Sequence, residues 1–399
     1  MNLFRIAWRN IAHKPLNTAL SLILLAFGVG IISLLLLLES SLQKEFDRNI
    51  KDIDMVLGAK GSPLQLILAN VYHIDAPTGN ISRAEAQRVM KHPYIDKAIP
   101  LAYGDNYRSY RIVGTTHQYP EHYEVGMQQG RLWEAPFEAT IGSKVAAESG
   151  MKIGDTFYSA HGLEDETDVH KDHAFTIVGI FAESGSVIDQ LILTPMESIW
   201  NVHEHPEELD GEAPPGPRPE DEITAVLLTK KNPLALVMIP TLIKDTNMQI
   251  ALPSIEINRL TQNFGIGMQT LQGIAILIMI ISFISVFISL YNSMKERKYE
   301  LALMRSMGAS RRTLFVMILL EGFWLTVVGT LIGLSLSRLG MIILSSVMKD
   351  QFKYDISNIG VLPNETILVG ITIFVGVLAS LLPAVSAVRM DVSKILGDA

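Results

Sequence analysis

The chain has 399 residues, of which 48% are hydrophobic and only 19% are charged, and it contains no cysteine. Because a soluble protein usually carries about 25% charged residues, this composition points to a protein with a membrane part. The absence of cysteine excludes disulfide bonds, thiolate metal sites and a cysteine nucleophile.

Charge is divided unevenly along the chain. Residues 39–263 contain 33 acidic and 19 basic residues, a net charge of −14, and the rest contain 8 acidic and 14 basic residues, a net charge of +6. The two values sum to the formal net charge of −8. An acidic central segment with basic flanks indicates that the two parts face different surroundings. Nucleic acid is not an expected partner, because its phosphates are bound by a basic face.

Four apolar stretches are long enough to cross a bilayer, which takes about 20 apolar residues as a helix. The first lies between Lys14 and Glu39 and the second between Arg259 and Lys295. The third covers residues 313–336, with a single charge (Glu321), and the fourth covers residues 366–388, with none. The predicted spans are 18–42, which includes a stalk, 265–292, 314–346 and 365–388.

The distribution of lysine and arginine predicts the orientation of the spans, because cytoplasmic loops carry an excess of both. The segments that carry this excess are the N-terminal amphipathic segment 1–17 and the loop 293–313, whereas the loop 347–364 has only two basic residues. Both termini, including the tail 389–399, and the loop 293–313 are therefore expected in the cytoplasm. A cleaved signal peptide is the alternative for the first span, but its apolar core is too long and no small-residue cleavage site follows.

The segment 43–262 is expected outside the cytoplasm and is long enough for an independent domain. Ser82 and Glu85 have the spacing of a capping box, which predicts a helix start, and Pro233 suits the first turn of another helix. Predicted strands lie at 107–115, 175–181, 187–193 and 223–229. Helices and strands interleave without a regular alternation, so the predicted fold class is an α-helical membrane protein with four transmembrane helices and a large extracytoplasmic α+β domain inserted between the first and second spans.

Three local motifs carry a resemblance to a known family. The first is Lys295-Glu-Arg-Lys-Tyr-Glu-Leu-Ala-Leu-Met-Arg-Ser-Met-Gly-Ala-Ser310, followed by Glu321-Gly322. The second is Ala139-Thr-Ile-Gly-Ser-Lys-Val-Ala, continued by Gly150 and Gly154-Asp155, and the third is Pro383-Ala384 with Ala387. Together with one span, a large domain and three clustered spans, these motifs resemble the MacB–FtsX type of ABC-transporter permease.

The resemblance implies a membrane subunit of a bacterial inner-membrane transporter, paired with a second copy or a paralogous permease. A separate ABC ATPase subunit would bind ATP and Mg²⁺, and no cofactor is expected on this chain itself. The sequence agrees, because it has no phosphate-binding G-x-x-x-x-G-K-[ST] loop, and no hydrolase motif appears either. Membrane lipid and a periplasmic partner or adaptor complete the expected partners.

Candidate coupling residues lie in the loop 293–313. Residues 295–307 form an amphipathic pattern, with Leu301, Met304 and Met307 on one side and a glycine as a helix terminator. The resemblance implies that this helix couples to the ATPase, whereas the alternative is a solvated interfacial helix without a partner. The coupling residues predicted are Glu296, Arg297, Lys298, Glu300, Leu301, Met304, Arg305 and Gly308.

Two charged residues fall within the third predicted span, 314–346. An intramembrane carboxylate is a functional-site hypothesis by default. Glu321, however, lies about 12 Å from the start of its span at 1.5 Å per residue, and a structural contact to a nearby basic residue or helix end is favoured. Arg338, near the far end of the stretch, is expected to extend to the membrane interface.

Histidines are concentrated in the acidic segment, where nine of the ten lie. Imidazoles beside carboxylates suit Zn²⁺, and the candidate ligands are His161, His170, His173, His203 and His205. The alternative is an acidic loop in which the histidines are incidental.

The expected function is to couple ATP hydrolysis by a partner to a conformational change of the outside domain, for export, for extraction of a lipoprotein or other substrate, or for mechanical transmission. The alternatives are a regulator of an outside partner such as a cell-wall hydrolase, and a zinc-linked transport component.

Overall fold

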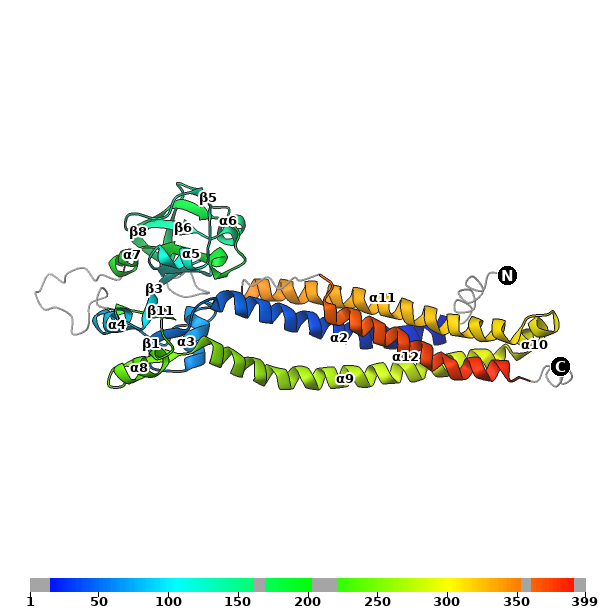
Figure 1. The fold of residues 1–399 in the computed structure, drawn as a ribbon. Coiled ribbons are helices and arrows are strands. Elements are labelled where there is room, and N and C mark those ends of the chain that lie inside the picture. The colour runs from blue at the N-terminus through cyan, green and yellow to red at the C-terminus, as the bar shows by residue number, and fades with distance from the viewer. Residues whose placement is uncertain (1–14, 161–168, 203–221, 353–359, 391–399) are drawn as a thin grey trace, which may run out of the picture. The chain divides into compact units, whose positions relative to one another are not determined.

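The computed structural model describes residues 15–160, 169–202, 222–352 and 360–390. The chain divides into two compact units, which are a helical unit formed by residues 1–43 with 263–399, and an inserted domain formed by residues 44–262. Four helices are long and apolar enough to cross a membrane, and a mixed α/β domain lies between the first and the second along the chain (Figure 1). The predicted fold class is therefore confirmed.

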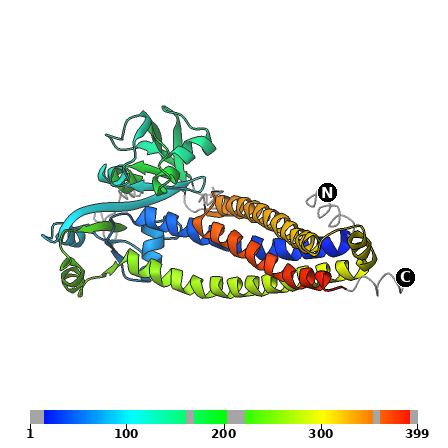
Figure 2. The ribbon, with the colours of Figure 1, turned by 45° about the vertical axis from the view of Figure 1, so that its right-hand side comes forward.

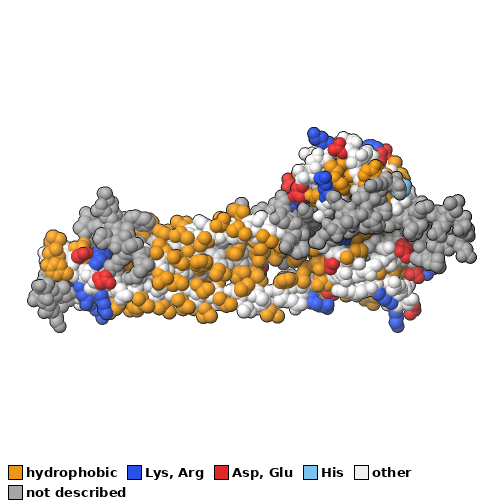
Figure 3. All heavy atoms as spheres, turned by 180° about the vertical axis from the view of Figure 1, so that it is seen from behind, with side chains coloured by type: hydrophobic (Ala, Val, Ile, Leu, Met, Phe, Trp, Pro, Cys, Tyr) orange, Lys and Arg blue, Asp and Glu red, His pale blue; other side chains and the backbone are white. Residues whose placement is uncertain are grey.

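The helical unit contains the four apolar helices and one short helix, drawn side by side in Figure 2. Their bounds are α2 (Pro15–Ile50), α9 (Pro253–Glu296), α10 (Lys298–Ser306), α11 (Arg311–Phe352) and α12 (Pro363–Val388). Apolar side chains cover the long helices in a continuous band, and charged side chains gather at the end that carries α10 (Figure 3). A band of this kind is what lipid requires of a spanning bundle.

Small residues allow α2, α11 and α12 to approach closely. A Cβ atom added at Gly333 of α11 would lie 2.8 Å from the carbonyl oxygen of Ala26 on α2, and one added at Gly322 would lie 2.5 Å from the Cβ of Ser380 on α12. Close backbone approach is the usual basis of helix association in membranes, where lipid is as apolar as leucine and there is little hydrophobic driving force between helices. Helix α11 therefore packs closely against both α2 and α12.

The inserted domain is a mixed α/β structure around a ten-stranded sheet with the order β12-β1-β11-β3-β4-β9-β6-β8-β5, to which β7 is added by pairing with β3 and β8. Most pairs are antiparallel, and the pairs β4–β9 and β6–β8 are parallel. The strands are β1 (Met55–Ala59), β2 (Ile81–Ser82), β3 (Ile95–Tyr107), β4 (Tyr110–Gly114), β5 (Met127–Gly130), β6 (Glu138–Ile141), β7 (Thr156–Ala160), β8 (Val169–Phe181), β9 (Leu191–Thr194), β10 (Glu222–Ile223), β11 (Ala225–Lys230) and β12 (Met248–Ala251). The helices are α3 (Pro63–Asn70), α4 (Arg83–Met90), α5 (Gln118–His122), α6 (Ser143–Ser149), α7 (Met196–Val202) and α8 (Ala235–Leu242), with a 3-10 turn η1 (Val187–Gln190).

Two apolar clusters stabilise this domain. The first core lies around β1, β11, β12, α4 and α8, and includes Met55, Val226 and Ile239. The second core lies around β4, β6, β8 and β9, and includes Ile112 and Phe175. Strand β3 runs from one core to the other, because it pairs with β11 on one side and with β4 on the other.

Local chemistry explains one confirmed prediction and one wrong one. The Ser82 hydroxyl accepts a hydrogen bond from the backbone N–H of Glu85, so α4 begins where the capping-box spacing placed it. The strand predicted at 187–193 is instead the turn η1 followed by β9. Backbone hydrogen bonding to the Ser186 hydroxyl and the Asp189 carboxylate favours the turn, as short polar side chains do when they compete with a sheet.

Candidate functional site

At one end of the helical unit, the short helix α10 connects α9 to α11 through two tight turns. Helix α9 ends at Glu296, a single residue separates it from α10, and α10 ends before Gly308, whose φ is 99°. The N–H of Gly308 donates to the carbonyl of Arg305, and the N–H of Ala309 donates to the carbonyl of Met304. This is the hydrogen-bond pattern of a Schellman C-cap, in which glycine tolerates the left-handed conformation. The chain can therefore turn sharply from α10 into α11.

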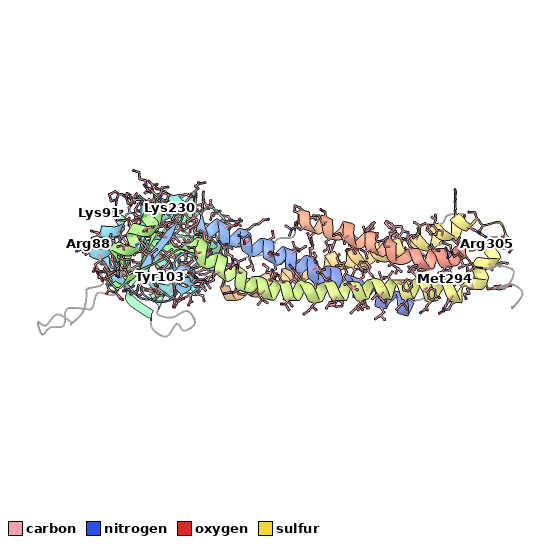
Figure 4. All side chains as sticks on the ribbon, turned by 60° about the horizontal axis from the view of Figure 1, so that its bottom comes forward. Arg88, Lys91, Tyr103, Lys230, Met294 and Arg305 are labelled. Atoms are coloured by element: carbon pink, nitrogen blue, oxygen red, sulfur yellow. The ribbon has the colours of Figure 1, made fainter. Side chains whose placement is uncertain are left out.

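Helix α10 is anchored on the helical unit by one face. Leu301 and Ala302 are buried, and Leu301 packs with Met294 of α9, Leu314 of α11 and Ala384 of α12. The guanidinium of Arg305 donates to the carbonyl of Met390 at 3.2 Å. Figure 4 shows Met294 and Arg305 together at this end. The apolar core beneath α10 thus joins three of the long helices.

The opposite face of α10 presents a second apolar stripe that the sequence pattern did not identify. Tyr299 is 52% exposed, Leu303 is 44% exposed and Met307 is 73% exposed. These residues recur at i, i+4 and i+8, so they lie on one side of the helix. The three residues predicted to form one apolar side do not share one environment. Leu301 is buried in the core, Met304 is half-buried and Met307 is exposed.

A charged pair lies beside this apolar core. Arg297 donates to the carboxylate of Glu321 at 3.2 Å and, through Nε, to that of Glu300 at 3.1 Å. The Glu321 side chain is only 6% exposed. Glu321 therefore contacts a basic residue at the junction of α9 and α10, whereas the remaining predicted charges, Glu296 and Lys298, lie on the exposed surface.

A second polar cluster lies about 25 Å further along α11, at 1.5 Å per residue from Glu321. Arg338 forms a two-point ion pair with Glu365 of α12, with one N–O distance of 2.7 Å. Ser33 of α2 donates to the same carboxylate at 2.5 Å, and Arg338 also contacts Ser337. The Arg338 guanidinium therefore binds a buried carboxylate, 1% exposed, and its expected position at the membrane interface stays a prediction.

Glu365 was missed because it lies immediately before the uncharged stretch that indicated the fourth span. A signal for it exists in the sequence, since Pro363 and Glu365 suit the first turn of a helix. In the structure the Glu365 carboxylate accepts a hydrogen bond from the backbone N–H of Leu362, the residue before α12. The side chain therefore caps α12 and binds Arg338 at once.

A buried polar network in the inserted domain was also missed. The ring of His73, a residue with φ of 57°, lies between two tyrosine hydroxyls, with Nε2 2.7 Å from Tyr119 and Nδ1 2.7 Å from Tyr103. Arg111 stacks over the Tyr103 ring, which Figure 4 labels. Burial of the His73 ring, together with the nearby Arg111 charge, holds the pKa of this histidine well below its usual value. Scattered residues of this kind carry no local sequence motif.

Of the five predicted zinc ligands, the structure describes the side chain of His173 alone. His161, His203 and His205 lie outside the described residues, as does the side chain of His170 in β8. His173 stacks on Phe137 with ring centroids 4.8 Å apart. No group of three histidine, aspartate or glutamate side chains suited to a metal occurs in the described part of the chain, and zinc binding stays a prediction.

Two family models match this chain. The model of the MacB-like periplasmic core domain matches residues 18–231, more than half of the chain. The model of the FtsX-like permease C-terminal matches residues 273–392. The chain belongs to the MacB/FtsX family of ABC transporter permeases. The FtsX-like match contains α10, α11 and α12, so both charged pairs of this permease lie in that part.

Solved structures similar to this permease include the periplasmic region of MacB from Actinobacillus actinomycetemcomitans, with 13% identity, a TM-score of 0.34 and coverage of 54% of this chain and 96% of the other. The extracellular domain of the noncanonic ABC-type transporter YknZ from Gram-positive bacteria is similar at 10% identity, with a TM-score of 0.31 and coverage of 50% and 98%. No curated protein matches the permease. Members of this family are multi-pass membrane subunits, normally non-catalytic, and the family implies an ATPase partner.

Proposed function

We propose that this permease couples ATP hydrolysis by a separate ATPase subunit to a conformational change of the inserted domain. The observation that carries the proposal is the exposed stripe of Tyr299, Leu303 and Met307 on α10. On the cytoplasmic side, which the excess of lysine and arginine predicts for this loop, these large apolar side chains would lie outside the hydrocarbon core of the membrane. An amphipathic helix with such anchors fits an apolar groove in a partner protein.

The anchored face of α10 supports transmission of movement from the partner. Leu301 contacts residues of α9, α11 and α12, and only Arg297 separates α9 from α10. Force applied to the exposed stripe would therefore act on three long helices rather than on a loose loop. The excess of lysine and arginine in the loop 293–313 supports a cytoplasmic position for this helix, where an ATPase would bind.

A pair of permease chains, either two copies or two paralogues, would give two ATPase subunits one α10 each. The inserted domain would then lie on the periplasmic side of a bacterial inner membrane and change shape there. This movement would serve export or extraction of a substrate, and it would equally serve activation of a periplasmic partner. We assign neither ATP hydrolysis nor a bound cofactor to this chain.

Replacing Leu303 and Met307 together by aspartate should weaken co-purification of the ATPase at least tenfold. Two central apolar anchors of an interface commonly contribute 2 kcal/mol or more, and about 1.4 kcal/mol is a factor of ten. The measurement is co-purification with the ATPase after co-expression, together with ATP hydrolysis in the purified complex. Leu234→Asp is a matched control, because Leu234 is an exposed leucine of the inserted domain. Wild-type co-purification by the double variant would contradict the proposed interface.

A further inference from the structure

The last turn of α2 is bound by a loop of the inserted domain. The guanidinium of Arg48 donates to the carbonyl oxygen of Gly185 at 2.7 Å. The backbone N–H of Val187 donates to the side-chain oxygen of Asn49 at 3.0 Å, and Asn49 is completely buried. We call Arg48, Asn49 and the loop 184–189 the clasp.

Tyr123 adds a further contact to the same helix end. Its hydroxyl donates to the carbonyl of Asn49 at 3.0 Å. The last carbonyl groups of a helix have no partner within the helix and must find one elsewhere. The inserted domain thus binds the end of α2 from two sides, with Tyr123 at a backbone carbonyl and the loop of the clasp at the side chains of Arg48 and Asn49.

Hydrogen bonds to the Asp189 carboxylate hold the loop of the clasp in place. The carboxylate of Asp189, a residue that is completely buried, accepts hydrogen bonds from the backbone N–H groups of Ser184 and Gly185, at 3.0 and 2.6 Å, and from the Ser184 hydroxyl at 2.9 Å. A buried carboxylate with several donors holds a loop in one conformation, because releasing any donor leaves an unsatisfied charge. A pull on Gly185 is therefore passed on to η1 and β9.

Gly185 is fitted to this contact in two ways. Its φ of 69° lies in the left-handed region that favours glycine. A Cβ atom added there would lie 2.3 Å from the Nη1 atom of Arg48. Because that atom is the far end of a flexible side chain, a methyl group at position 185 would displace Arg48, in addition to the backbone strain that alanine has at this φ.

The path of the chain explains why the clasp matters. Helix α2 leads into β1, and β12 leads into α9, so both connections to the membrane helices enter the first core. The loop of the clasp leads instead into β9, whose Ile192 belongs to the second core. The end of α2 also has contacts outside the clasp, because Tyr123 binds the Asn49 carbonyl and Lys51, the residue after α2, pairs with Glu124 at 2.7 Å. The clasp differs in that its loop leads directly along the chain into β9.

We propose that the clasp transmits displacement of α2 to the second core, and that Arg48, Asn49 and Gly185 are positioning residues for ATP-driven movement of the inserted domain. The inference rests on the proposed function. Beyond that function, we propose that the second core moves and that the clasp moves it. Both α2 and α9 are joined to the first core along the chain, and α2 is also bound by the loop that leads into β9 of the second core. A displacement of α2 against α9 would therefore act on the second core as well as on the first.

The test measures the distance between the two cores in the full-length permease bound to its ATPase. Spin labels are placed on cysteines introduced at Gln128 in β5 and Lys244 after α8, both exposed, in a chain that has no native cysteine. Labelled chains are diluted with unlabelled ones, and pulsed electron paramagnetic resonance gives the distance with and without ATP. The wild type should show an ATP-dependent change, and Gly185→Ala and Arg48→Ala should both lose it.

Gly150→Ala is the matched control, because Gly150 has a φ of 75° and no neighbouring atom within 4 Å of an added Cβ. It introduces the same backbone strain without touching a contact, and should keep the ATP-dependent change. If Gly185→Ala and Arg48→Ala move like the wild type, or if Gly150→Ala also loses the change, the clasp is overturned while the proposed function stands. If the wild type shows no change with ATP, the clasp is overturned as well, whereas failure of the proposed function is recognised separately, by wild-type co-purification of the ATPase with the Leu303 and Met307 double variant.

Discussion

Removing one partner of the Arg338–Glu365 pair should lower the stability of the permease by about 3–5 kcal/mol. That is the usual cost of leaving an uncompensated charge in a buried site. The Glu365 side chain is 1% exposed and that of Arg338 17% exposed, so water can replace little of the lost interaction. Among the described residues, Arg338→Met would leave the carboxylate with Ser33 and the N–H of Leu362 as its donors.

The measurement is thermal unfolding of the purified chain in detergent micelles, for Arg338→Met, Glu365→Gln and the double variant. The double variant should recover a large part of the loss, because replacing both charges removes the uncompensated one. Arg311→Met, at an exposed position, is the control and should change stability by less than about 0.5 kcal/mol. Single variants as stable as this control would show that the pair does not hold α2, α11 and α12 together.

Acidification from pH 6.5 to pH 5 should destabilise the inserted domain through His73. The folded state keeps this ring neutral because its pKa is held well below the usual value, whereas the unfolded chain binds a proton below about pH 6.5. Stability is therefore complete above the usual pKa and falls as the pH drops below it, by up to about 1.4 kcal/mol per pH unit for this group. His122, whose pKa is also lowered by burial, adds to the fall.

His73→Asn should reduce this pH dependence. Asparagine tolerates the left-handed conformation and can both donate and accept hydrogen bonds, so the domain should fold with some loss of stability at neutral pH. The measurement is thermal unfolding of the full chain between pH 5 and 8. Between pH 7 and 8 the curves of variant and wild type should run parallel, and below pH 6.5 the wild type should fall more steeply. Equal slopes below pH 6.5 would contradict the role given to His73.

The four long helices could be predicted from hydropathy, because continuous apolar stretches of this length have few other uses. Helix ends were harder. Helix α9 begins at Pro253, 12 residues before the predicted span at 265, because the polar residues between them contain no helix breaker and no apolar pattern to mark a boundary. The start of α4 was found because the capping-box signal of Ser82 and Glu85 is local.

Contacts between distant residues could not be predicted in this way. The amphipathic pattern of residues 295–307 contains two apolar stripes, and only the packing of Leu301 on Leu314 and Met294 decides which stripe is buried. Arg338 and Glu365 lie on different helices, and nothing local indicates that they meet. The order of strands in the inserted domain likewise depends on pairing between residues far apart in sequence, as between β4 and β9.

The most direct test of the central claim is site-specific crosslinking from α10 in the cells that make this permease. The chain has no native cysteine, so one introduced at Leu303 can carry a photoreactive group as the single attachment point. We expect a covalent adduct with a nucleotide-binding ATPase subunit, identified by mass spectrometry. The same group at Lys244 of the inserted domain should give no such adduct. A correctly inserted chain that gives no ATPase adduct from position 303, or one that gives it equally from position 244, would contradict the claim that α10 couples this permease to an ATPase.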